Sequence, residues 1–259
     1  MITLKNPDQL AKMRSAGHLL YDVIQRLREA VKPGETTAAL DAYAEEMIRR
    51  NNAIPSSLNY CGYPKSICAS IDDEVVHGIP SDDIELKEGQ IISLDVTLLL
   101  DGWQADSALT VPVGQISAEK ADLIRVTEES FWMGARQALC DHHVGDISHA
   151  VQRHAEAHGY GVVRDLTGHG IGRKMHEDPA VPNFGEEGHG TKLRPGMTIT
   201  IEPMIAMGTW RVHELANDWT FVTNDHQPAS HYEHTLAIRR DGLPEILTLP
   251  DGGWKGEPV

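Results

Sequence analysis

The sequence predicts a duplicated α+β fold, because one order of elements occurs twice along the chain. A long helix, a glycine-containing turn, a second helix and short strand-like runs fill the first half, and the same order begins again at Ser117. A constant shift along the chain also aligns four identical pairs: Arg14 with Arg125, Gly34 with Gly145, Ala44 with Ala155 and Glu45 with Glu156. No linker or low-complexity segment separates the halves. We therefore expect one domain over residues 1–259, with an internal pseudo-repeat of roughly 7–115 and 117–240 and one central sheet.

Two helices are expected at the start of the first half. Asn6-Pro7 has the form of an N-cap followed by proline at the first helical position, and Gln9 occupies the capping-box position. Apolar residues at helical spacing then form one face: Leu10, Met13, Leu20, Ile24 and Leu27. The segment TAALDAYAEEMIRR predicts a second helix that ends near Asn51-Asn52, and short strand-like runs follow it.

The second half repeats this pair of helices. The segment AEKADLIRVTEESFWMGARQAL after Ser117 predicts a long helix, HHVGD predicts a turn, and ISHAVQRHAEAHGY predicts a second helix that closes at Gly159. Five histidines in or beside this last helix are interpreted as surface residues: His142, His143, His149, His154 and His158.

The composition is that of an acidic globular protein, for which we expect a cytoplasmic location. Hydrophobic residues make up 41% of the chain, and the formal net charge of -15 argues against nucleic acid or an anionic membrane surface as a partner. The three cysteines (Cys61, Cys68 and Cys140) cannot all pair and form no C-x-x-C motif, so a reducing compartment is expected. No secretory signal is visible at the start, and no apolar run approaches the roughly 20 residues of a membrane span.

A β-hairpin in the segment IISLDVTLLLDGWQADSALTV brings two aspartates together. Asp101-Gly102 is a strong signal for a two-residue turn, and with that turn Thr97 lies opposite Asp106. Asp95 shares the face of Thr97, so the two aspartates become diagonal neighbours about 7–8 Å apart at the backbone. Like charges at that distance disfavour each other unless a cation lies between them. The competing interpretations are a three-residue loop, which would break this register, or an aspartate that merely ends a strand.

Two glutamates occur in strand-like segments where a buried, apolar side chain is expected. The alternation in TITIEPM predicts a half-buried strand over residues 198–201 that ends on Glu202, and Pro203 stops the ladder. Glu233 lies in a second strand-like run, SHYEHTLAI. A carboxylate at the end of an apolar strand is costly unless its charge is stabilised. A salt-bridged strand glutamate is the alternative interpretation of each.

The segment TGHGIGRKMHEDP carries His169 and His176 in a glycine-rich setting. It lacks the G-x-G-x-x-G spacing and the strand–turn–helix context of a phosphate-binding loop, so that interpretation is discounted. Glycines beside a histidine let the backbone approach closely and leave the imidazole accessible.

Four carboxylates and one imidazole together suit a centre of two divalent metals. The ligand set is Asp95, Asp106, His169, Glu202 and Glu233. Four negative ligands offset two 2+ ions, and bridging carboxylates suit metals about 3.5–4 Å apart. The carboxylate-rich set is compatible with Fe, Mn or Co, and it also admits Zn.

These residues, in this order, resemble the methionine aminopeptidase family of pita-bread metalloproteases. The matching segments are SICASIDDEVVHGIP, SLDVTLLLDGWQADSALT, TGHGIGRKMHEDP, LRPGMTITIEPM and YEHTLAI, which span essentially the whole chain. The resemblance implies a pita-bread fold, in which pseudo-twofold duplicated helix pairs pack on a central curved, mainly antiparallel sheet. The short interval between Glu202 and Glu233 and the early first helix are similar to the short bacterial type 1 form.

The resemblance also implies a role for each site residue. Asp95, Asp106, His169, Glu202 and Glu233 would be the metal ligands, His77 would contact the scissile amide, and His176 would hydrogen-bond its carbonyl. The pocket for the methionine side chain would comprise Tyr60, Tyr63, Cys68 and Trp219, for which plain core packing is the alternative. Met175 stands where bacterial members place an aromatic residue and Cys61 where they often have histidine, so both are expected to reshape the rim of the pocket.

The expected activity is removal of the N-terminal methionine from peptides and nascent proteins when the second residue is small. A metal-activated hydroxide would attack the first peptide bond, with Glu202 moving the proton. The resemblance implies a monomer and an association with the ribosome. Two other interpretations stay open: an Xaa-Pro peptidase on the same fold, and a non-catalytic module of this fold that binds partner proteins.

Overall fold

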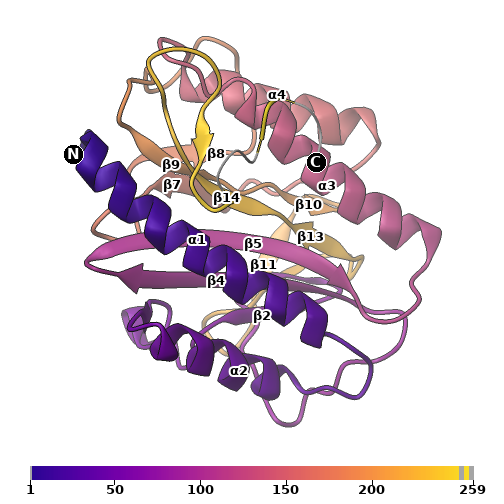
Figure 1. Ribbon diagram of the computed structural model, residues 1–259. Helices are drawn as coiled ribbons and strands as arrows, with labels where there is room; N and C mark the ends of the chain where they lie inside the picture. The colour runs from indigo at the N-terminus through magenta and orange to yellow at the C-terminus, as the bar shows by residue number, and fades with distance from the viewer. Residues whose placement is uncertain (1, 251–253, 257–259) are drawn as a thin grey trace.

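A curved sheet with two pairs of helices on its outer side forms the fold (Figure 1). The computed structural model describes residues 2–250 and 254–256. The helices are α1 (Pro7–Ala30), α2 (Thr37–Arg50), α3 (Ala118–Ala135) and α4 (Val144–Ala157), and a 3-10 turn spans Tyr60–Gly62. The strands are β1 (Ile54–Pro55), β2 (Cys68–Ile71), β3 (Glu74–Val76), β4 (Ile91–Leu100), β5 (Trp103–Pro112), β6 (Gly161–Val162), β7 (Thr167–Gly170), β8 (Glu177–Pro182), β9 (Thr198–Ile201), β10 (Met204–Ala206), β11 (Val212–Glu214), β12 (Phe221–Thr223), β13 (Ala229–His231), β14 (Glu233–Ala237) and β15 (Glu245–Ile246).

The main sheet takes strands from both halves of the chain. Its order is β1-β4-β5-β14-β9-β7-β8, with β2 paired to β4 and β15 paired to β14, and every one of these pairs is antiparallel. Two smaller sheets, β13-β10-β6 and β11-β12-β3, flank it. The α+β class and the mainly antiparallel sheet are therefore confirmed. The division into two pseudo-repeats within one domain stays a prediction.

The helices cover the sheet through two apolar clusters. In Figure 1, α1 lies across β4 and β5, and α3 and α4 lie over the opposite end of the sheet. One cluster joins α1 and α2 to β4 and β5, and the other joins α3 and α4 to β8, β9 and β14. The inner face of the sheet is thereby left to carry polar side chains.

Helix α1 begins as the sequence predicts. Asn6 Oδ1 accepts the Gln9 N–H at 2.9 Å, and Gln9 Oε1 accepts the Asn6 N–H at 3.0 Å, which completes the capping box. Helix α2 also has the predicted bounds.

The helices of the second half differ from the prediction at their junction. Helix α3 ends at Ala135 rather than Leu139, because the next N–H groups bond three residues back (Gln137 to Gly134, 2.9 Å). Helix α4 begins at Val144, inside the segment predicted as a turn, because the Asp146 carboxylate accepts the His143 N–H at 2.7 Å and caps the helix. The histidines of this region are mostly half-buried, and only His158 is exposed as predicted.

The hairpin between β4 and β5 has the predicted register. Asp101 and Gly102 both take positive φ (50° and 77°), as the two-residue turn requires. Thr97 pairs directly with Asp106, and Asp95 pairs with Ala108. The alternative of a three-residue loop is excluded.

Two strand predictions need correction. β9 is buried on both faces rather than half-buried, because the hydroxyls of Thr198 and Thr200 find partners inside: Thr198 Oγ1 donates to the Ile171 carbonyl oxygen. The predicted run around Glu233 is two strands that break at Tyr232, since β13 pairs with β10 whereas β14 pairs with β9 and β5.

Candidate metal centre

Five neighbouring strands of the main sheet each supply one of the predicted ligands. Along the order β4-β5-β14-β9-β7 these are Asp95, Asp106, Glu233, Glu202 directly after β9, and His169. The sheet therefore brings together residues that lie far apart in the sequence. Antiparallel pairing fixes this arrangement: Glu233 pairs with Ala108, which also pairs with Asp95 on its other side.

Three of the five ligands converge tightly. Ligand atoms of Asp106, His169 and Glu233 all lie within 4.8 Å of one another. His169 Nε2 is 3.7 Å from Asp106 Oδ2 and 3.5 Å from Glu202 Oε1. The Nδ1 atom of His169 lies 2.9 Å from the Gly170 carbonyl oxygen, which holds a proton on Nδ1 and turns the Nε2 lone pair toward the carboxylates.

Threonines orient two of these carboxylates. Thr97 Oγ1 donates to Asp106 Oδ1 at 2.9 Å, and Thr200 Oγ1 donates to Glu202 Oε1 at 2.8 Å. Thr200 is a site residue that the sequence interpretation missed, although its position two residues before Glu202 in a strand places both on one face.

Burial without a counter-charge strongly shifts the pKa values of the candidate ligands. Burial raises the pKa of Asp95 to about 7, and burial together with repulsion between the carboxylates raises the pKa values of Asp106 and Glu233 well above their usual range. The pKa of Glu202 is raised in the same way. Burial lowers the pKa of His169 to about 4, so the imidazole stays neutral, as a metal ligand requires.

The residues present fit divalent cations. Glu233 Oε1 is buried and has no hydrogen-bond partner among the described residues, and no Lys or Arg is among the described residues that line the cavity. A buried, unpaired carboxylate oxygen is costly unless a cation is bound to it. Oxygen ligands with one imidazole suit first-row divalent ions.

A cavity of about 160 Å³ opens onto these ligands. All eleven predicted site residues line it, and Ser57, Thr97 and Met175 also contribute; the eleven are Tyr60, Tyr63, Cys68, His77, Asp95, Asp106, His169, His176, Glu202, Trp219 and Glu233. Of the two positions expected to reshape the rim, Met175 lines the cavity, whereas Cys61 is exposed and is not part of the lining.

The wall of the cavity is aromatic on one side. The rings of Tyr63 and Trp219 meet edge to face with centroids 5.0 Å apart, and Cys68 is buried beside them. The Tyr63 hydroxyl donates to the carbonyl oxygens of Ile67 and Gly78 at 3.1 and 3.0 Å, which fixes the ring. This wall therefore combines a rigid apolar surface with a sulfur atom.

The two histidines outside the ligand set lie at the edge of the centre. His176 Nδ1 is 2.7 Å from the Tyr60 hydroxyl, and its ring centroid is 4.3 Å from that of His169. His77 has a positive φ of 58°, a conformation that side chains rarely adopt and that functional sites retain. Burial lowers the pKa of both His77 and His176, which keeps them neutral.

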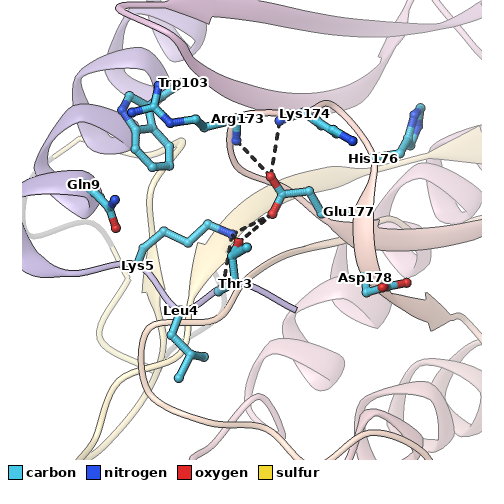
Figure 2. Close-up of a pocket in the computed structure, with 10 residues that line it drawn as sticks. All are labelled: Thr3, Leu4, Lys5, Gln9, Trp103, Arg173, Lys174, His176, Glu177 and Asp178. Carbon is cyan, nitrogen blue, oxygen red and sulfur yellow. Dashed lines mark hydrogen bonds and ion pairs between the residues drawn. The ribbon is translucent and has the colours of Figure 1, made fainter. Parts of the chain in front are cut away.

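Contacts between the residues that line a groove beside the cavity hold the His176 loop in place (Figure 2). Its volume is about 720 Å³. Figure 2 shows Glu177 at its centre, where its carboxylate accepts from Lys5 Nζ at 2.9 Å and from the backbone N–H groups of Arg173 and Lys174. The Arg173 guanidinium lies 4.5 Å from the centroid of the Trp103 ring. These contacts tie the loop to the N-terminal segment and to the β4–β5 hairpin.

His231 is a second residue that sequence reasoning missed. It is buried, its Nε2 is 4.0 Å from Glu233 Oε2, and neither of its ring nitrogens has a hydrogen-bond partner among the described residues. Its position two residues before Glu233 was the available signal. Burial lowers its pKa to about 3, so it is neutral beside Glu233.

Comparisons with known proteins agree with this geometry. The profile of the metallopeptidase family M24 matches residues 11–240. The methionine aminopeptidase of Clostridium acetobutylicum is 52% identical over 96% of this chain and 99% of that protein, and methionine aminopeptidase 1 of Bacillus subtilis is 44% identical over 96% and 99%. The crystal structure of methionine aminopeptidase from Rickettsia prowazekii has a TM-score of 0.94 and 41% identity, and the match covers 96% of this chain and all of that one. The prolidase from Pyrococcus horikoshii, at 20% identity and a TM-score of 0.75, shares the fold.

The chain belongs to the M24 metallopeptidase family, whose pita-bread fold and use of divalent metal it shares. Within that family it groups with the bacterial methionine aminopeptidases, and it is accordingly a hydrolase of the metallo-aminopeptidase class.

Proposed function

We propose that this enzyme removes the N-terminal methionine from peptides and nascent proteins whose second residue is small, at a centre of two divalent metal ions. The observation that carries the proposal is the single cavity that joins the five candidate ligands to an apolar, sulfur-containing wall. The choice of methionine as the first residue rests on the relatives, which are named methionine aminopeptidases. Neither half of the cavity would serve this reaction without the other.

Asp95, Asp106, His169, Glu202 and Glu233 would hold the two ions. When bound, the ions would supply Lewis-acid chemistry, polarising the scissile carbonyl and lowering the pKa of the attacking water. Fe, Mn, Co and Zn all suit this ligand set.

Glu202 would move the proton. Its Oε1 accepts the Thr200 hydroxyl, which leaves Oε2 to receive a proton from the attacking water and to deliver it to the leaving amine.

His176 and His77 would bind the peptide bond. In the proposed tautomer the Tyr60 hydroxyl would donate to His176 Nδ1, 2.7 Å away, which would leave the proton of the neutral imidazole on Nε2 for the scissile carbonyl oxygen. The lowered pKa of His77 keeps it neutral beside the peptide. A large second side chain would meet His77, so small second residues are preferred.

Tyr60, Tyr63, Cys68 and Trp219 would bind the methionine side chain. An unbranched thioether packs well against aromatic rings, and sulfur–aromatic contacts add to its affinity. Charged first residues would lose their hydration in this pocket without compensation.

The cellular setting is part of the proposal. No helix of the described residues is long and apolar enough to cross a membrane. The three cysteines are free, and the substrates would be new chains, so we propose that a monomer with one catalytic domain acts in the cytoplasm on chains at the ribosome.

The Glu202→Gln variant tests the proposed chemistry. Metal-loaded wild-type protein should release methionine from a Met-Ala peptide, and the variant should lose at least ~100-fold in kcat, the usual lower contribution of a positioned base. Glu187→Gln, at a glutamate whose side chain is 72% exposed, is the matched control and should keep the wild-type rate. A kcat close to wild type in a metal-replete Glu202→Gln sample would rule out the role of Glu202, and no bindable divalent metal at all would favour the non-catalytic alternative.

A further inference from the structure

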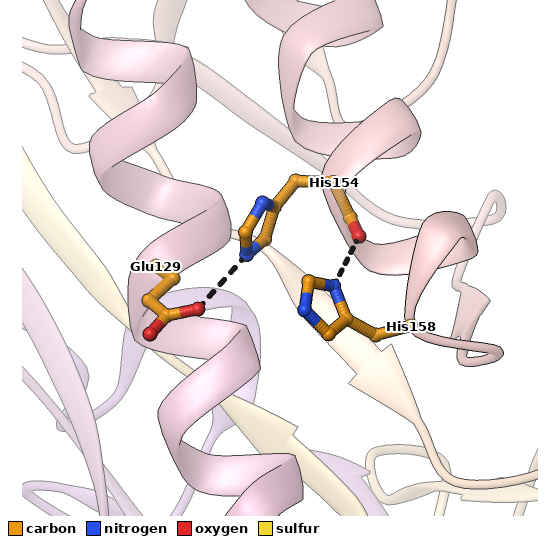
Figure 3. Close-up of side chains that lie close together, drawn as sticks. All are labelled: Glu129, His154 and His158. Carbon is orange, nitrogen blue, oxygen red and sulfur yellow. Dashed lines mark hydrogen bonds and ion pairs between the residues drawn. The ribbon is translucent and has the colours of Figure 1, made fainter.

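A second cluster of metal-binding side chains lies on the outer, helical side of the protein. Glu129 projects from α3, His154 projects from α4, and His158 is the C-cap residue directly after α4 (Figure 3). None of the three lines the cavity that contains Asp106. The cluster is therefore separate from the catalytic centre, and the proposed function leaves it without a role.

Ligand atoms of these three residues lie close enough to share one ion. They all lie within 4.8 Å of one another, and His154 Nε2 is 3.1 Å from Glu129 Oε2. Ligand atoms around a tetrahedral ion with bonds of about 2.0–2.2 Å are roughly 3.4 Å apart, so the most distant pair must close by about 1.4 Å at most. Side-chain rotation supplies such a movement, because His158 is exposed and the other two side chains are partly exposed.

The hydrogen bonds prepare His158 as a ligand. Its Nδ1 lies 2.9 Å from the carbonyl oxygen of His154, an acceptor, so the ring proton is held on Nδ1 and Nε2 keeps its lone pair. Figure 3 shows this other ring nitrogen turned toward the space beside His154 and Glu129. A ligating histidine whose second nitrogen donates to a backbone carbonyl is the usual arrangement in metal sites.

The carboxylate of Glu129 is held in place from its other side. Arg125 Nη1 lies 2.7 Å from both carboxylate oxygens, and Arg125 Nη2 also contacts Asp122. Burial acts to raise the pKa of Glu129, but hydrogen bonds from Arg125 and His154 lower it overall, so the group is ionised. A carboxylate offers about four lone-pair positions, so Arg125 orients Glu129 and leaves a position on Oε2 for an ion. Because Asp122 shares the charge of Arg125, the local net charge does not repel a cation.

The close packing of α3 against α4 brings the three side chains of the cluster together. Gly134 allows the close approach: a Cβ there would lie 2.7 Å from Cγ2 of Val151. His154 and His158 are four residues apart at the end of α4, where His158 is the C-cap, and their ring centroids are 4.6 Å apart. Two histidines and a glutamate from the facing helix complete a three-ligand set with an open fourth position, which zinc favours.

We propose that Glu129, His154 and His158 bind one Zn²⁺ ion between α3 and α4, with water in the fourth position. The ion replaces the proton that His154 Nε2 donates to Glu129 Oε2, and that proton is released to solvent. The bound ion joins the two helices on the outer side of the second half. The chain's net charge of -15 favours the approach of a cation to this surface.

Zinc titration tests the site independently of catalysis. Metal-free wild-type protein, His158→Ala and Glu129→Gln are titrated with zinc sulfate in competition with a chromophoric zinc chelator. The catalytic carboxylates are intact in all samples, so zinc bound there is a common background. His149→Ala is the matched control, since His149 lies in α4 and is also near a glutamate (Glu187, 3.6 Å), but among the described residues it belongs to no metal-binding cluster.

Wild-type protein and His149→Ala should bind one more zinc ion per chain than the two test variants, or bind it at least ~10-fold more tightly. Circular dichroism should show the same helix content in all four proteins, because the substituted side chains are at least partly exposed. A crystal soaked in zinc should give an anomalous peak between Glu129 and the two histidines. Equal zinc stoichiometry and affinity in wild type and His158→Ala would overturn the proposal, and so would an equal loss in His149→Ala.

Discussion

In the metal-free protein, Asp95 should contribute stability that is lost as the pH rises, and the size of this contribution can be worked out. Burial raises the pKa of Asp95 from 3.8 to about 7, so the folded apoprotein binds this proton more tightly than the unfolded chain does. A raised carboxyl pKa stabilises the fold at low pH, and this contribution is lost as the pH rises through 7. At pH 5 the folded protein is two pH units below this pKa, and each unit contributes about 1.4 kcal/mol to the unfolding free energy. The total of about 3 kcal/mol is lost by pH 8.

Buried histidines act in the opposite direction and have to be subtracted. Burial lowers the pKa of His169 to about 4 and the pKa values of His231 and His234 to about 3. These groups destabilise the folded state at low pH, and stability returns as the pH rises to about 6.5. Wild type and Asp95→Asn share the same histidines, so their difference reports Asp95 together with its repulsion of Asp106, Glu202 and Glu233.

The assay is urea unfolding of the chelator-stripped proteins from pH 5 to pH 8. Relative to Asp95→Asn, wild type should lose about 3 kcal/mol of unfolding free energy over this range. Asp82→Asn, at an exposed aspartate, should follow wild type. At pH 8, added Mn(II) should stabilise wild type more than Asp95→Asn, because the ion stabilises the ionised carboxylate. Parallel curves for wild type and Asp95→Asn across this pH range would refute the reasoning.

Two substitutions around the cavity have separate expected effects. Thr97→Val keeps the side-chain shape but removes the 2.9 Å hydrogen bond to Asp106, so metal affinity should fall ~10–100-fold in a calorimetric titration; unchanged affinity would show that Thr97 does not orient this ligand. Trp219→Ala removes the aromatic wall packed on Tyr63, so kcat/KM for a Met-Ala peptide should fall roughly 10-fold, mainly through KM, since an aromatic contact contributes about 0.5–1.5 kcal/mol beyond its buried area. An effect on kcat alone would place Trp219 outside the methionine pocket.

Local rules explain why much of the fold was predictable. The Asp101-Gly102 turn fixes the register of β4 and β5, and with it the pairing of Thr97 with Asp106. The capping box at Asn6 fixes the start of α1. The start of α4 was predicted too late because Gly145 resembles a turn residue, whereas the close approach of the His189 and Glu186 carbonyl oxygens excludes a side chain there.

The candidate site was predictable where a residue conflicts with its local pattern. Glu202 directly follows a buried strand and Glu233 begins another, and a carboxylate at either position conflicts with the apolar pattern and marks a site without any knowledge of the sheet order. Thr200 and His231 were missed because they satisfy the strand pattern, and their roles depend on contacts across strands. The groove around Glu177 was also out of reach, since Lys5 and Glu177 meet only after the N-terminal segment folds onto the His176 loop.

The most direct test of the central claim is kcat/KM on free-amine peptides that begin Met-Ala, Met-Ile, Leu-Pro and Lys-Ala, with Fe(II), Mn(II) or Co(II) supplied in turn. The apolar wall of Tyr63, Cys68 and Trp219 predicts that Met-Ala is cleaved efficiently and that Lys-Ala is not cleaved. The position of His77 predicts that Met-Ile is cleaved very slowly. Fastest cleavage of Leu-Pro, or cleavage of Met-Ile as fast as Met-Ala, would contradict methionine excision even with the metal centre intact.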